Sequence, residues 1–281
     1  MPVAKTKKEL KTRLDQLHPN ENLGLVPTMG ALHKGHASLI KKAVSENTNV
    51  VVTIFVNPTQ FNNQEDLEKY PKTLDADLEL IFSISEDILV FSPKVAEIYP
   101  DKVTPKMYDF NGLDKVMEGE FRKDHFNGVG TVVEEILTLI EPTKAYFGEK
   151  DFQQLRIIQK LVEIKEIPVE IIGCEIVREA HGLAMSSRNE RLRPELRQNA
   201  GFIYDTLQTA KNKFGTESVL NVKEWVKKQF LKNDDLKLEY FEITDTETLT
   251  PAKIKIEKTK YRGFIAVYAD DVRLIDNIAL N

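Results

Sequence analysis

Cysteine is almost absent from this chain of 281 residues, in which Cys174 is the only one. A single cysteine excludes an intrachain disulfide and a cysteine-based zinc site. Cys174 lies in the apolar run "VEIIGCEIV" (residues 169–177), so we expect it to be a buried core side chain. The N-terminus lacks the apolar segment of a signal peptide, and no apolar run is long enough to span a bilayer. These absences predict a protein of the reducing cytoplasm with no membrane partner.

An excess of positive charge is also missing. The chain has 39 Lys and Arg against 44 Asp and Glu, a formal net charge of −5. Proteins that hold nucleic acid by its phosphates usually show a basic excess or a basic patch. The main lysine cluster opens an expected helix (residues 5–17), where a solvated face is its ordinary role. We therefore expect no nucleic-acid partner.

The first two-thirds of the chain alternates short apolar runs with helical patterns. The run "VVVTIFV" (residues 50–56) is continuous and β-branched, which is typical of a strand buried on both faces. Such alternation predicts an α/β fold with a parallel, Rossmann-like sheet. The expected strands are residues 23–27, 50–56, 87–93, 145–148 and 169–177, and the expected helices are residues 5–17, 34–45, 66–82, 131–140 and 152–166.

The pattern changes near Pro194. Residues 194–213 and 218–232 read as helices, and residues 238–245, 252–258 and 263–274 then alternate as strands with short turns. We expect a Rossmann-like α/β domain over residues 1–189, followed by a smaller α+β domain over residues 190–281.

Three polar loops follow expected strands of the parallel sheet. They are "PTMGALHKGH" (residues 27–36), "NPTQF" (57–61) and "GEKDFQQ" (148–154). Ligands of open parallel sheets bind beyond the carboxyl ends of the strands. The convergence of three such loops on one edge predicts a binding site there.

The stretch "HKGH" places His33 and His36 three residues apart at an expected helix start. A helix N-terminus favours phosphate, imidazole N–H groups add donors, and Gly35 permits close approach. Two solvated histidines are the ordinary interpretation of this spacing. A zinc site would need a third ligand, and no H-E-x-x-H pattern is present.

Further polar residues follow the later strands. Lys150 can meet a phosphoryl group as a mobile charge, although a surface lysine is the default interpretation. Asp151 is a candidate helix cap, and Gln154 can hydrogen-bond a substrate hydroxyl. In "MSSRN" (residues 185–189), serine and arginine side chains can bind phosphate, or can simply form a polar turn between domains.

Two carboxylates lie near a helix start in "YPKTLDADL". Helix capping is the ordinary interpretation for Asp75. Asp77 is left open between capping and coordination of Mg²⁺ carried by a nucleotide.

Six blocks in this order carry a family resemblance: "PTMGALHKGHASLI", "VVTIFVNPTQF", "YPKTLDADL", "HFNGV", "YFGEKDFQQL" and "GLAMSSRN". Together they resemble the pantothenate synthetase (pantoate–β-alanine ligase) family, and the endings "YFEITDTETL" and "RLIDN" extend the likeness over the whole chain. "HKGH" and "MSSRN" resemble the two signatures of the HIGH-type nucleotidyltransferase superfamily, which includes class I aminoacyl-tRNA synthetases.

The resemblance implies a ligase of pantothenate biosynthesis. The family makes pantoyl adenylate from pantoate and Mg-ATP with release of pyrophosphate, and β-alanine then displaces AMP. Members have a Rossmann-type domain and a small C-terminal lid domain, are usually homodimers, and use ATP as substrate with Mg²⁺.

The resemblance also assigns residues by position. The phosphate-contacting catalytic set is His33, His36, Lys150, Ser186, Ser187 and Arg188. The ATP-binding set is Pro27, Met29, Gly35, Gly148, Lys150, Asp151, Val177 and Met185, with Asp151 on the ribose. The pantoate set is Met29, Gln60, Phe61 and Gln154, and Asp77 is the metal candidate.

Three positions depart from the family pattern. Ala76 stands where another acid is usual, Asn127 where a basic residue is common, and His181 where Asp is expected. None of these touches the histidine pair, Lys150 or the two glutamines. Three rival functions are another adenylyl- or cytidylyltransferase, a nucleic-acid-binding module and a catalytically dead interaction protein. The Gln60 and Gln154 pair argues against the first, and the acidic net charge argues against the second. The intact polar loops argue against the third.

Overall fold

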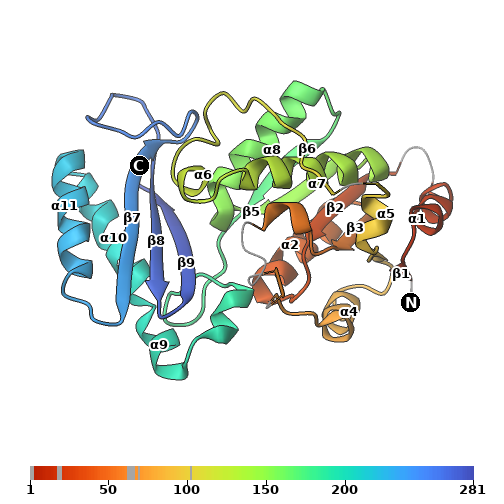
Figure 1. The fold of residues 1–281 in the computed structure, drawn as a ribbon, viewed down its shortest axis with the longest axis horizontal. Coiled ribbons are helices and arrows are strands. Elements are labelled where there is room, and N and C mark those ends of the chain that lie inside the picture. The colour runs from red at the N-terminus through yellow and green to blue at the C-terminus, as the bar shows by residue number, and fades with distance from the viewer. Residues whose placement is uncertain (1–2, 18–20, 62–66, 69, 102) are drawn as a thin grey trace. The chain divides into compact units, whose positions relative to one another are not determined.

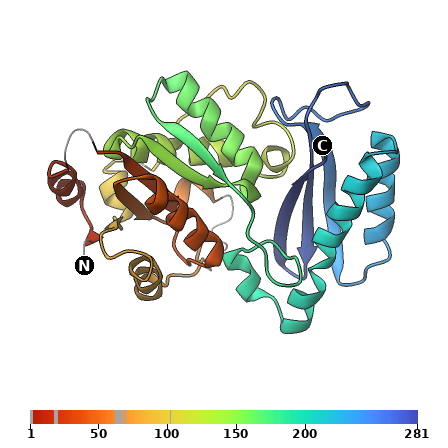
Figure 2. The same cartoon turned by 180° about the vertical axis from the view of Figure 1, so that it is seen from behind.

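The computed structural model describes residues 3–17, 21–61, 67–68, 70–101 and 103–281 (Figures 1 and 2). The chain divides into two compact units. Unit 1 comprises Met1–Asp114, Glu118–Glu149 and Gln154–Glu175. Unit 2 comprises Lys115–Met117, Lys150–Gln153 and Ile176–Asn281.

Unit 1 is built on a parallel sheet of six strands in the order β1-β4-β3-β2-β5-β6. Every strand pair in this sheet is parallel, so the predicted α/β class is confirmed. The apolar side chains of β3 are buried because helices cover the sheet, as the continuous β-branched run predicts. The strands are β1 (Val3–Ala4), β2 (Leu23–Thr28), β3 (Asn49–Ile54), β4 (Leu89–Phe91), β5 (Lys144–Gly148) and β6 (Glu170–Cys174).

The strand order reverses direction at β2. From β2 the chain moves outward to β3 and β4, and it then returns to β5 and β6 on the other side of β2. The helices that follow β2 and β5 therefore diverge, and a crevice forms between such helices at the carboxyl ends of the two strands. This topology makes the loops after β2 and β5 the expected ligand-binding loops of unit 1.

The helices of unit 1 differ from the predicted ranges at two starts. Helix α7 begins at His125 and not at residue 131, because its first turns are buried on all sides and show no amphipathic period. Helix α4 begins at Leu74, after Pro71, a residue type that disfavours helix just before it. Residues 66 and 69 of the predicted helix lie outside the described residues. The helices are α1 (Lys7–Leu14), α2 (Lys34–Glu46), α4 (Leu74–Phe82), α5 (Val95–Ile98), α6 (Glu118–Phe121), α7 (His125–Ile140) and α8 (Phe152–Lys165), whose first two residues count with unit 2.

Unit 2 has an antiparallel sheet in the order β7-β8-β9. Its strands are β7 (Leu236–Asp245), β8 (Tyr261–Ala269) and β9 (Val272–Ala279), and its helices are α9 (Pro194–Asn199), α10 (Phe202–Phe214) and α11 (Val219–Phe230). The predicted strand over residues 252–258 is wrong, since these residues form bends and a turn. The predicted strand over residues 263–274 is a hairpin, which turns at Asp270 with φ of 52°.

The predicted single helix over residues 194–213 is two helices. Helix α9 ends at Asn199 and α10 begins at Phe202, with Gly201 between them. A Cβ atom on Gly201 would lie 2.3 Å from the backbone oxygen of His181. Glycine is therefore required at this break by the close approach of two distant segments, which helical periodicity does not reveal.

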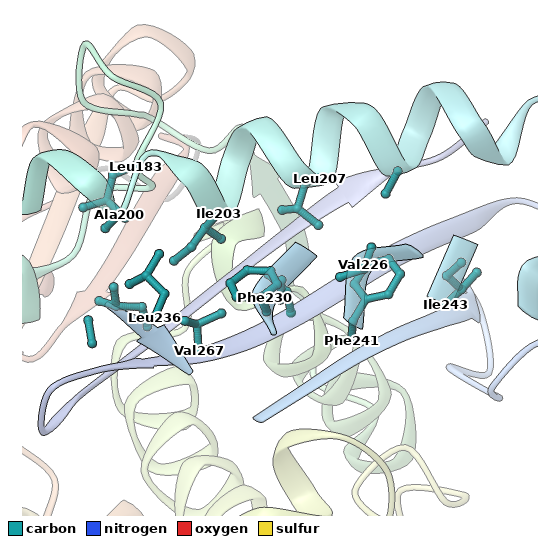
Figure 3. Packing of buried hydrophobic residues seen from close by; sticks show 14 of the residues in the cluster. Leu183, Ala200, Ile203, Leu207, Val226, Phe230, Leu236, Phe241, Ile243 and Val267 are labelled. Atoms are coloured by element: carbon teal, nitrogen blue, oxygen red, sulfur yellow. The ribbon is translucent and has the colours of Figure 1, made fainter. Parts of the chain in front are cut away.

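Helices α10 and α11 pack on one face of the unit 2 sheet. Figure 3 shows Ile203 and Leu207 of α10 meeting Val226 and Phe230 of α11 and Val267 of β8. All five side chains are buried, and their removal from water stabilises the unit.

Unit 2 begins earlier in the chain than the domain boundary expected at residues 189 and 190. Its main segment starts at Ile176. Arg178 pairs with Ala184 in an isolated bridge, and its guanidinium donates to Asp276 of β9 at 2.6 and 3.0 Å. Because these contacts join residues 178–184 to β9, this loop belongs to the unit that contains the C-terminal sheet.

Gly128→Ala should destabilise the protein. A Cβ atom at this position of α7 would lie 2.1 Å from the backbone oxygen of Thr59, and backbone on both sides has little room to move. We expect a loss of about 1–3 kcal/mol, well above the helix-propensity gain of alanine. Urea unfolding measures this loss as a lower midpoint. Gly148→Ala is the control, because among the described residues no atom lies within 4 Å of its added Cβ; equal midpoints for the two variants would contradict the prediction.

Candidate active site

The loop after β2 turns sharply through two left-handed residues. Gly30 has φ of 79° and Ala31 has φ of 51°. The hydroxyl of Thr28 donates to the backbone oxygen of Thr53 at 2.7 Å and accepts from the N–H of Gly30 at 3.2 Å. The turn is therefore anchored to β3 before the chain enters "HKGH".

Asp77 of α4 holds the other side of this turn. One carboxylate oxygen accepts from the N–H of Ala31 at 3.0 Å, and the other accepts from the N–H of Leu32 at 2.7 Å. Asp77 is only 2% exposed. A Cβ atom on Gly30 would lie 2.9 Å from Asp77 Oδ2, so the carboxylate also requires glycine there.

These contacts bear on the metal assigned to Asp77 by resemblance. Both carboxylate oxygens already accept backbone N–H groups, and the hydroxyl of Thr73 donates to one of them at 3.2 Å. Mg²⁺ needs oxygen ligands with accessible lone pairs and usually keeps several waters. Asp77 therefore fits a backbone-holding role and does not fit a resident magnesium site. Asp75, expected to cap, lies in the first turn of α4, whose N-cap is Thr73.

His33 and His36 form a reciprocal cap at the start of α2. His33 is the N-cap, and its Nδ1 accepts from the N–H of Gly35 at 3.1 Å. Nδ1 of His36 accepts in turn from the N–H of His33 at 3.3 Å. A neutral imidazole that accepts at Nδ1 carries its proton at Nε2. The two rings, with centroids 4.1 Å apart, thus present Nε2–H donors at the positive end of the helix.

The "NPTQF" loop after β3 is fastened to α7. Nδ2 of Asn57 and the hydroxyl of Thr59 both donate to the backbone oxygen of Gly128, each at 3.1 Å. The hydroxyl of Tyr99 donates to Oδ1 of Asn57 at 2.9 Å. Burial raises the pKa of Tyr99 to about 12, so this hydroxyl remains a neutral donor.

Two residues assigned to pantoate lie together at this loop. Nε2 of Gln60 is 2.7 Å from the sulfur of Met29, so the loops after β2 and β3 meet. The backbone oxygen of Gln60 lies 2.8 Å from Nδ1 of His125, which fixes the end of the 3₁₀ helix η1 (Pro58–Gln60). Phe61, the third assigned residue, packs edge-on against Tyr70 with ring centroids 5.7 Å apart.

The two glutamines at the start of α8 have different surroundings. Gln153 is buried, and its amide donates to the backbone oxygen of Val116 at 2.8 Å within unit 2. Gln154, assigned to pantoate, is half-buried and counts with unit 1. Gly148, assigned to ATP, ends β5 at the same edge of the sheet as the end of β2.

Unit 2 holds the "MSSRN" loop. Ser186 is the N-cap of the 3₁₀ helix η3 (Ser187–Arg191), and its hydroxyl oxygen accepts from the N–H of Arg188 at 3.3 Å. The N–H of Met185 donates to the backbone oxygen of Val177 at 2.9 Å, which joins two residues assigned to ATP. Asn189 is buried, and its amide donates to Glu179 at 2.8 Å. The loop is therefore ordered by its own side chains.

Lys150 and Asp151 lie on another segment of unit 2, in the 3₁₀ helix η2 (Glu149–Asp151). Nζ of Lys150 is 4.0 Å from the carboxylate of Asp151. The backbone oxygen of Lys150 accepts from the side-chain amide of Asn277 at 2.9 Å. Asn277 is not among the residues assigned from the sequence, where its only signal is the "RLIDN" ending.

Of the three residues that depart from the family pattern, two make hydrogen bonds within the fold and one is exposed. Asn127 is buried, and its Oδ1 accepts from the N–H of Tyr108 at 3.1 Å. Nε2 of His181 lies 2.8 Å from the backbone oxygen of Arg197 in α9. Ala76 is exposed on the first turn of α4. Asn127 and His181 therefore serve the local fold.

The described part of the chain lacks two other kinds of feature. Within it, no helix combines the length and apolar character needed to cross a membrane. No group of three or more His, Cys, Asp or Glu side chains among these residues is placed to hold a metal ion.

Cys174 is buried as expected, and burial raises the pKa of its thiol to about 11, which suits a core residue and not a nucleophile.

Asp77→Asn should lower the stability of the protein in magnesium-free buffer. An amide has one acceptor oxygen, so the part-buried N–H of Ala31 or Leu32 would lose its partner, at a cost of about 1–3 kcal/mol. Urea unfolding with chelator present measures this effect. Asp75→Asn, an exposed change in the same helical turn, is the matched control. Identical unfolding midpoints for the two variants would show that Asp77 does not hold the turn.

Known proteins of one family are similar to this chain over almost its whole length. The model of the Pantoate-beta-alanine ligase family matches residues 2–279. A pantothenate synthetase of Christiangramia forsetii is 58% identical over 261 residues, which are 93% of this chain and 92% of the relative. A pantothenate synthetase of Flavobacterium psychrophilum is 50% identical over 281 residues and covers 100% of both chains.

Solved structures give the same answer. The pantothenate synthetase of Thermus thermophilus superposes with a TM-score of 0.91 at 37% identity, covering 100% of this chain and 99% of that chain. A pantoate–β-alanine ligase of Francisella tularensis, complexed with beta-gamma ATP and β-alanine, has a TM-score of 0.83 at 36% identity, covering 100% and 98%. Matches of this extent show that the chain belongs to the pantoate–β-alanine ligase family.

Proposed function

We propose that this protein condenses pantoate with β-alanine to form pantothenate, in an ATP-dependent reaction that proceeds through pantoyl adenylate. The observation that carries the proposal is the reciprocal His33–His36 cap at the start of α2, in a chain that matches the family over residues 2–279. This cap puts two imidazole donors and a helix N-terminus at the point where the strand order reverses.

In the first step a carboxylate oxygen of pantoate attacks the α-phosphorus of ATP. A P–O bond forms to the acyl group, the bond to the β-phosphate oxygen breaks, and pyrophosphate leaves with the bonding electrons. Negative charge grows on the phosphates as the bond breaks. His33 and His36 stabilise this charge because their Nε2–H donors are already oriented, so little reorganisation is needed.

Other residues share the handling of ATP under this proposal. Lys150 and Arg188 supply positive charge, and the hydroxyls of Ser186 and Ser187 donate to phosphate oxygens. Asp151 accepts from the ribose hydroxyls. The nucleotide contacts that remain are those of Pro27, Met29, Gly35, Gly148, Val177 and Met185.

Pantoate selection falls to the glutamines. The amides of Gln60 and Gln154 pair with the hydroxyl and carboxylate groups of pantoate, while Met29 and Phe61 cover its apolar part. The contact between Gln60 and Met29 supports this grouping, because it joins a polar and an apolar member of the set.

In the second step the neutral amine of β-alanine attacks the acyl carbon of pantoyl adenylate. A C–N bond forms, the amine loses a proton, and AMP leaves with the electrons of the acyl–oxygen bond. The same fixed donors stabilise the charge that returns to AMP.

Magnesium enters the proposal only as a companion of ATP. The carboxylate of Asp77 is occupied by backbone N–H groups and does not fit a resident site. We propose that Mg²⁺ arrives bound to the ATP phosphates, and that the enzyme acts in the cytoplasm as a homodimer.

One assay tests the function directly. AMP release from ATP is measured with pantoate and β-alanine added singly and together. Full turnover should need both acids, and pantoate alone should support exchange between ATP and pyrophosphate. Turnover with a different acid, or with CTP in place of ATP, would instead indicate another nucleotidyltransferase of the superfamily.

His36→Ala should slow pantoate-dependent exchange between ATP and pyrophosphate. Loss of one oriented donor to the developing charge costs about 3 kcal/mol, or about a hundredfold in rate. Lys34→Ala, an exposed change in the same turn of α2, is the control and should retain most of the rate. An unchanged rate in the His36 variant would exclude the assigned role.

Gln154→Ala should weaken pantoate binding far more than ATP binding. A substrate hydroxyl left without its amide partner discriminates strongly against the defective site. Steady-state kinetics with each substrate varied should show the KM for pantoate rising by about tenfold or more while the KM for ATP changes little. Gln159→Ala, on the same helix, is the control. Equal increases for both substrates would argue against a pantoate contact.

A further inference from the structure

Two adjacent polar residues of β9 are buried, although β9 is an edge strand of its sheet. Asp276 is 4% exposed and Asn277 is 2% exposed. Buried polar groups are costly unless they are hydrogen-bonded, so such a pair has to be explained by its partners.

The two side chains lie on opposite faces of the sheet, because successive residues of a strand alternate. Asp276 is directly opposite Ile265 of β8, whose side chain belongs to the core under α10 and α11. Asn277 is directly opposite Phe264, whose ring packs on Phe152 with centroids 6.0 Å apart. The pair therefore reaches two different segments of unit 2.

On its face, Asp276 fixes the loop that leads to "MSSRN". Its carboxylate accepts two bonds from the guanidinium of Arg178, at 2.6 and 3.0 Å. Arg178 also donates to the backbone oxygen of Gly182 at 3.1 Å and lies 3.7 Å from the ring centroid of Tyr204. A bidentate pair of this kind fixes direction as well as distance.

On the other face, Asn277 fixes the backbone of Lys150. Its Nδ2 donates to the oxygen of Lys150 at 2.9 Å, and its Oδ1 accepts from Arg262 at 2.5 Å. The guanidinium of Arg262 lies 3.9 Å from the ring centroid of Phe152, two residues after Lys150. The backbone N–H of Asn277 donates to Asp276 Oδ1 at 2.7 Å, which helps to fix the backbone from which the side chain extends.

We propose that Asn277 is a positioning residue for Lys150 and so sets the place of the lysine charge during adenylate formation. The proposal rests on the proposed function, in which Lys150 follows the charge on the phosphates. A lysine side chain is long and flexible, so its attachment point determines where its charge can act. Small displacements of a catalytic group are costly in rate.

A double-mutant cycle tests this inference. Pantoate-dependent exchange between ATP and pyrophosphate is measured for the wild type, Lys150→Ala, Asn277→Ala and the double variant. Asn277→Ala should slow exchange about tenfold when Lys150 is present. It should have little further effect when the lysine side chain is already absent, since the two residues act through one contact. Equal slowing in both backgrounds would mean a general structural role and would overturn the inference.

Amide hydrogen exchange supplies a readout that does not need activity. Asn277→Ala should raise exchange in residues 148–153. Asn281→Ala is the control, because the Asn281 side-chain amide makes two hydrogen bonds in unit 2, to the backbone of Thr259 and Tyr261, and its loss should leave residues 148–153 unchanged. Unchanged exchange in the Asn277 variant would overturn the inference.

The experiments also distinguish misfolding of the Asn277→Ala variant from failure of the proposed function. If Asn277→Ala does not fold, Asn277→Asp replaces it in the cycle, since it keeps the acceptor for Arg262 and removes the donor to Lys150. If the wild type shows no pantoate-dependent exchange, the proposed function fails. Hydrogen exchange in residues 148–153 then decides alone whether Asn277 holds Lys150.

Discussion

The carboxylate of Asp77 is the constraint on which the rest of the unit 1 site depends. The chain leaves β2 through left-handed Gly30 and Ala31, and this geometry directs two successive backbone N–H groups inward. Asp77 accepts both, so the turn can be buried without an unpaired donor. Helix α2 begins two residues after Leu32. Because Asp77 of α4 holds Leu32, α4 helps to set the orientation of the α2 N-terminus.

The same device recurs in the other polar loops. Asn57 and Thr59 bind the backbone of α7, Ser186 caps its own turn, and Asn277 holds the carbonyl of Lys150. Each loop uses an amide, hydroxyl or carboxylate to bind backbone, so its conformation is held by contacts within the chain. Reactions that develop charge benefit from donors that need no reorganisation. Many polar residues of the motifs thus serve to hold the loops themselves.

The parallel sheet could be predicted because its signal is local. Continuous apolar strands and amphipathic helices such as α2 show their period in a short window of sequence. The first turns of α7 are buried on all sides, and the break between α9 and α10 lies at a glycine packed against a distant segment, so neither boundary left a periodic signal. Residues 252–258 alternate between apolar and polar side chains, but they have no partner strand and form bends and a turn. For the site, residue types and loop positions were visible, but the role of Asp77 was not. A carboxylate in a first helical turn has the same local sequence whether it faces solvent, a metal or a backbone turn 45 residues away.

Lys150 follows a strand of the parallel sheet in the sequence, but its contacts are with unit 2. By sequence it belongs to the loop between β5 and α8, and this placement identified it as a candidate for the sheet edge. By its contacts it belongs to unit 2, where β9 holds its backbone from 127 residues further along the chain. The same strand holds Arg178, from which the chain continues to the "MSSRN" loop. The two unit 2 segments that carry the positively charged members of the proposed ATP set are therefore tied to consecutive residues of one strand. A change in β9 would affect both segments together, which gives the C-terminal "RLIDN" a physical reason to accompany the motifs of the proposed ATP set.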